Sequence, residues 1–66
     1  MSDPMAAHVI GNAISKLVDR LTRLQEHLVE MVAAGADADE IEQQRQDILV
    51  MEQRITAAEK VQESYL

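Results

Sequence analysis

The sequence of 66 residues predicts an all-α fold, an antiparallel hairpin of two long helices. Apolar residues recur in heptads on both sides of a central break, as in helices that pack along a narrow seam. The break combines Gly35, a residue that ends helices, with Asp37, a residue that starts them. No stretch alternates apolar and polar residues with β-branched side chains, so no strand is expected.

The first helix is expected over about residues 4–33. Asp3 can cap it, and Pro4 suits its first position, where the missing N–H costs nothing. Gly11 is the one weak point, at up to about 1 kcal/mol relative to alanine. Every seam position over four heptads is apolar: Ala7, Ile14, Leu21 and Leu28 at the a positions, Ile10, Leu17, Leu24 and Met31 at the d positions.

The turn is expected over residues 34–37. Gly35 can adopt the left-handed conformation that closes a helix. Asp37 can cap the second helix, which begins at Ala38, and Glu40 can reach back to complete a capping box. Because the stop and start signals lie so close together, the connection is short and the two helices must be antiparallel.

The second helix is expected over about residues 38–63, and its seam is less regular. Gln44 and Gln62 fall at seam positions and are expected to interrupt the apolar contact, whereas Tyr65 closes the seam. Met51 is expected to fill the core rather than to bind a partner. The apolar seam residues of this half are Ile41, Ile48 and Ile55 at the a positions, with Met51 and Ala58 at the d positions.

Two helices that pack only on each other form a thin object, so we expect a partner or dimerisation to complete the single hairpin of residues 1–66. Large aliphatic residues also fall outside both seams. The run from Ile48 to Met51 is apolar throughout, and one helix cannot bury it all on one face. The expected partner-binding residues are Val9, Val18, Val29, Val32, Leu49, Val50 and Val61.

The net charge of −6 argues against a nucleic-acid or anionic-membrane partner, because both bind clustered Lys and Arg. No apolar run is long enough for membrane insertion, and the N-terminal stretch lacks the features of a signal peptide. Residues 37–66 carry eight acids and three bases. The acidic second helix is therefore expected either to keep the chain soluble or to face a basic partner surface.

We expect no enzyme active site, no metal and no cofactor. His8 and His27 would lie about 29 Å apart along one helix, and the chain has no cysteine to complete a metal site. Ser15 and Ser64 have no base placed to activate them, and a hairpin offers no cleft that excludes water.

The second half resembles the YscE/PscE-type small co-chaperones of bacterial type III secretion. The resemblance lies in Gly35-x-Asp37-Ala38-x-x-Ile41 and Met51-Glu52-x-x-Ile55, within residues 35–61. It implies a TPR-like chaperone as partner, which together with the small protein keeps the needle subunit unpolymerised in the bacterial cytoplasm. It also implies that Gly35, Asp37 and Ala38 fix the turn while Ile41, Met51 and Ile55 pack the seam.

A second resemblance is to the Rop-type hairpins, which share the string DADE near the turn, here residues 37–40. It implies a homodimeric four-helix bundle. RNA binding by such hairpins needs a basic face with an aromatic residue on the first helix, and here that helix has Lys16, Arg20 and Arg23 but no aromatic residue. The alternative expectation is therefore a homodimeric regulator or scaffold that does not bind RNA.

Overall fold

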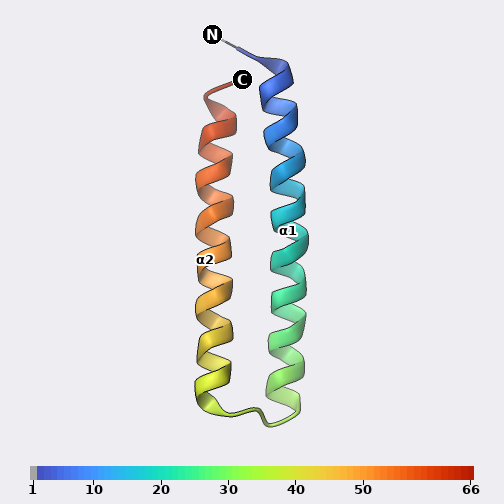
Figure 1. Ribbon diagram of the computed structural model, residues 1–66, viewed down its shortest axis with the longest axis vertical. Coiled ribbons are helices and arrows are strands. Elements are labelled where there is room, and N and C mark those ends of the chain that lie inside the picture. The colour runs from blue at the N-terminus through green and yellow to red at the C-terminus, as the bar shows by residue number, and fades with distance from the viewer. Residues whose placement is uncertain (1) are drawn as a thin grey trace.

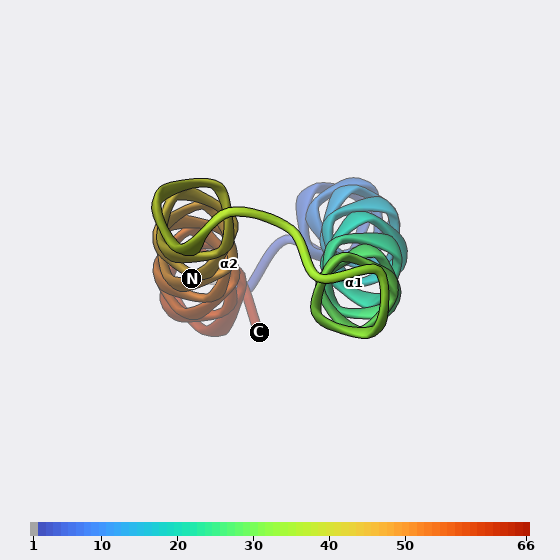
Figure 2. The ribbon, with the colours of Figure 1, turned by 90° about the horizontal axis from the view of Figure 1, so that it is seen from below.

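A computed structural model describes residues 2–66, which form two antiparallel α-helices, α1 (Pro4–Ala33) and α2 (Ala38–Glu63) (Figure 1). These residues contain no strand. The helices lie side by side in a single layer, and the Cα positions extend over 51 × 14 × 9 Å (Figure 2). The prediction of an all-α helical hairpin is confirmed.

The open end of the hairpin holds both termini (Figure 1). Asp3 caps α1, because its carboxylate accepts a hydrogen bond from the Ala6 N–H at 3.1 Å, and Pro4 follows at the first helical position. The Asp3 N–H in turn donates to the Tyr65 carbonyl at 2.7 Å. Tyr65, which lies after α2 and is 37% exposed, thus joins the two ends through its backbone.

The turn begins with a Schellman motif at the end of α1. Gly35 has φ +73°, in the left-handed region that favours glycine. Its N–H donates to the Val32 carbonyl at 3.1 Å, and the Ala36 N–H donates to the Met31 carbonyl at 2.9 Å. These two bonds satisfy carbonyls that the last turn of a helix leaves free.

The expected capping box at the start of α2 is wrong. Asp37 occupies the N-cap position, but its side chain makes no capping hydrogen bond, and Glu40 makes none in return. Asp37 is an exposed residue. The acidic residues Asp39 and Glu40 still lie in the first turn, where the helix dipole favours negative charge.

One row of side chains from each helix fills the seam between α1 and α2. Ala7 and Met51 are buried, at 5% and 8% exposure. The other apolar seam residues are only half-buried, because each helix has a single neighbour to cover it. These half-buried residues are Ile10, Ile14, Leu17, Leu21, Leu24, Leu28, Met31, Ile41, Ile48, Ile55 and Ala58.

Gln44 and Gln62 interrupt the apolar side chains of the seam, and both amides donate across it. The Gln44 amide donates to the Leu24 carbonyl at 3.0 Å, and the Gln62 amide donates to the Ala7 carbonyl at 3.1 Å. A helical carbonyl has a second lone pair free for such a bond. These polar contacts lie toward opposite ends of the hairpin and favour one register of α2 against α1.

Gly11 makes room for the Gln62 amide. A Cβ atom added at Gly11 would lie 2.9 Å from Gln62 Nε2, closer than the two atoms can approach. The sequence marks this glycine only as a weak point in α1. Its role depends on a side chain that lies on the other helix and almost at the other end of the chain.

We expect Gly11→Ala and Gln62→Ala to be coupled in their effects on the free energy of unfolding. In the native chain, the gain of about 1 kcal/mol in helix propensity is offset by displacement of the Gln62 amide, whose hydrogen bond contributes about 0.5–1.5 kcal/mol. In the Gln62→Ala background, Gly11→Ala should stabilise by the full amount. Urea unfolding of the four chains measures this coupling, and an identical effect of Gly11→Ala in both backgrounds would contradict it.

Candidate functional site

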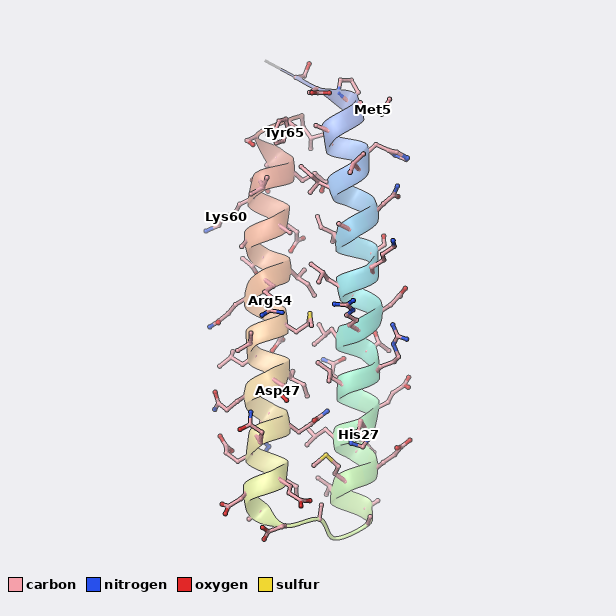
Figure 3. All side chains as sticks on the ribbon, in the orientation of Figure 1. Met5, His27, Asp47, Arg54, Lys60 and Tyr65 are labelled. Atoms are coloured by element: carbon pink, nitrogen blue, oxygen red, sulfur yellow. The ribbon has the colours of Figure 1, made fainter. Side chains whose placement is uncertain are left out.

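The hairpin has two broad faces, because its helices lie side by side (Figure 1). We call the face turned toward the viewer in Figure 3 the front face; it carries His27 of α1 and Asp47 and Arg54 of α2. Each of these residues comes directly before a residue at an a position of the heptad pattern. Because a helix turns about 100° per residue, residues one before or two after an a position lie on the front face. Residues one or four after it lie on the opposite face, the back face.

All seven expected partner-binding residues are exposed, between 43% for Val18 and 68% for Val29. They do not form one stripe, because their heptad positions divide them between the two faces. Val9, Val50 and Val61 lie on the front face. Val18, Val29, Val32 and Leu49 lie on the back face.

The exposed apolar side chains belong to a molecule with a large surface for its mass. The accessible surface is 4975 Å², whereas a compact monomer of this mass exposes about 4,200 Å². Three further apolar residues are exposed at the open end, outside the expected partner-binding set. They are Met5, Tyr65 and Leu66.

His27 and Ser64, two polar residues considered for reactive chemistry, both lie on the surface. His27 Nδ1 lies 3.8 Å from a Glu30 carboxylate oxygen, and both side chains are well exposed. The Ser64 hydroxyl donates to the Val61 carbonyl at 2.6 Å, within its own helix end. Among residues 2–66, no group of three or more His, Cys, Asp or Glu side chains could hold a metal ion.

A hollow at the open end is lined by Asp3, Pro4, Met5 and His8. It is a broad, open depression in the surface, so it does not shield a bound group from water. This geometry lacks the enclosure that small-molecule sites use to bury most of a ligand.

Within residues 2–66, neither helix has an apolar stretch long enough to cross a membrane. Comparison with known proteins found no matching family model, no similar curated protein and no similar solved structure.

Proposed function

We propose that this chain is a non-catalytic protein-binding module whose hairpin docks on a helical partner. The observation that supports this proposal is the exposure of the seven aliphatic side chains outside the seam, on a hairpin only one layer thick. Burial of such side chains contributes about 25 cal/mol per Å² of apolar surface. The ridges of two adjacent helices also form grooves into which a third helix packs.

The most specific form of the proposal is a type III secretion co-chaperone. In this role the chain would stabilise a TPR-like chaperone in the bacterial cytoplasm and help to keep the needle subunit unpolymerised. Its support is the resemblance carried by Gly35, Asp37, Ala38 and Ile41 and, further along, by Met51 and Ile55.

The alternative is a homodimer that forms a four-helix bundle and acts as a regulator or scaffold. It is supported by the same exposed aliphatic residues, since a second copy would cover them as well as a different protein would. It differs from the first proposal in what the isolated chain should do in solution.

The experiment combines light scattering with thermal unfolding followed by circular dichroism. The first proposal expects a monomer of 7.4 kDa with a broad, low-temperature melt, which gains helicity and stability when a purified TPR-like needle chaperone is added. A stable species of twice this mass with a sharp melt, unaffected by the chaperone, would contradict it and support the homodimer.

A further inference from the structure

The back face of α1 presents a continuous row of residues without charge. Successive members lie three or four residues apart, so they share one side of the helix. No Asp, Glu, Lys or Arg belongs to it, and its three valines are 43–68% exposed. We call this set the uncharged row: Ser15, Val18, Thr22, Gln25, Val29 and Val32.

The back face of α2 is acidic. Four glutamates lie on it with a single base, Arg45, and all five residues are exposed. Among residues 2–66, no Lys or Arg side chain lies within 4.0 Å of a carboxylate, so these charges are not neutralised by ion pairs within the chain. We call the glutamates the acidic row: Glu42, Glu52, Glu59 and Glu63.

Two of the three hydroxyl groups on this face are already bonded within their own helices. The Thr22 hydroxyl donates to the Val18 carbonyl and the Thr56 hydroxyl donates to the Glu52 carbonyl, each at 3.1 Å. These groups need no new partner when water is removed. Leu49, 46% exposed, adds an aliphatic side chain on the α2 side. The face therefore offers apolar contact along α1 and negative charge along α2.

The charges disfavour a second copy of this chain on the back face. In a two-fold dimer, the same patch of both copies meets, so each acidic row would face either the other acidic row or an uncharged row. Neither arrangement supplies a row of bases, and the first brings like charges together. The bases of α1 do not help, because Lys16, Arg20 and Arg23 all lie on the front face.

We propose that the back face binds an amphipathic helix of a partner protein, with its apolar stripe on the uncharged row and Lys or Arg residues above the acidic row. The inference rests on the proposed protein-binding function and adds to it the face and the chemistry of the partner. Exposed pairs of opposite charge steer such a helix and set its orientation, and salt screens them. Binding should therefore weaken as salt concentration rises.

The test uses two synthetic helical peptides of about 20 residues, which is about the length of the uncharged row. Both carry the same leucine stripe, and one edge of the stripe bears lysines in one peptide and glutamates in the other. The lysine-edged peptide should bind the full chain at least about tenfold more tightly at low salt. In spectra of the labelled chain, it should perturb the methyl signals of Val18, Val29 and Val32.

A charge reversal tests whether the face, rather than the net charge, decides the preference. Glu52→Lys with Glu59→Lys should make the chain prefer the glutamate-edged peptide. The matched control on the front face, Glu40→Lys with Asp47→Lys, has the same spacing and the same charge change, and it should keep the lysine preference. All four positions are exposed, and circular dichroism verifies that both variants keep their helicity.

Three results would overturn the inference: binding of neither peptide, equal binding of both, or a preference that the front-face control reverses. Self-association of the chain would also overturn it, if Glu52→Lys with Glu59→Lys abolished the oligomers and the front-face control did not. The acidic row would then bind a neighbouring copy of the chain. The broader proposal is judged separately, by whether the TPR-like chaperone stabilises a monomeric chain. Failure of the peptide test alone leaves that result unchanged.

Discussion

Met51→Ala is expected to lower the free energy of unfolding by about 2–4 kcal/mol. Met51 is 8% exposed, and the other buried apolar residue, Ala7, is much smaller. Truncation removes its contacts with α1 and leaves a cavity that a seam one side chain wide cannot refill from a second layer. Domains are stable by only about 5–15 kcal/mol, so this change should remove a large share of the free energy of unfolding.

Urea or thermal unfolding followed at the helical circular-dichroism band measures this effect. Met5→Ala is the matched control, because Met5 also lies in a helix but is 73% exposed. The control exchanges the same residue types at the surface and should change stability by less than about 0.5 kcal/mol. Similar effects of the two substitutions would show that Met51 does not pack in the seam.

Gln44→Leu is expected to raise the free energy of unfolding by about 1–2 kcal/mol. Gln44 is 9% exposed, and its amide donates to the Leu24 carbonyl. Leucine cannot make this hydrogen bond, but it buries more apolar surface than glutamine. It also loses less side-chain conformational entropy on folding. The Leu24 carbonyl keeps its bond within α1, so the exchange leaves no buried polar group without a partner.

Gln53→Leu provides the control, because Gln53 is exposed on the same helix. This substitution should change the free energy of unfolding by less than about 0.5 kcal/mol. The gain at Gln44 should come at the expense of specificity, since a polar seam residue selects one register and one association state. Light scattering of Gln44→Leu should therefore show more self-association than the native chain. A loss of stability would mean that the hydrogen bond outweighs apolar burial.

Several features of the fold could be predicted because they depend on neighbouring residues. The heptad spacing places the seam residues between Ile10 and Met31 along one side of the helix, whatever the helix packs against. Asp3 caps α1 through the N–H three residues on. Gly35 ends α1 because its left-handed conformation is favoured in glycine. The capping box is the local expectation that failed, although Asp37 occupies the N-cap position as expected.

The polar seam residues could not be interpreted in this way. Gln62 bonds to Ala7 across a separation of 55 residues, and Gly11 is explained only by that contact. Composition likewise shows that the second half is acidic, but four of its glutamates share one face with an uncharged row of the other helix. The spacing of these glutamates relative to the a positions is visible in the sequence. It identifies a shared face with α1 only once the packing of the two helices is known.

Helix periodicity and glycine stereochemistry act within a few residues, so the two helices, their ends and the apolar side of each could be predicted from the sequence. The rotation and alignment of α2 against α1 become known only from the folded structure. That alignment turns Gln44 and Gln62 into donors across the seam. It also divides the exposed valines between two faces, since contacts between residues far apart in sequence exist only after the chain has folded back on itself.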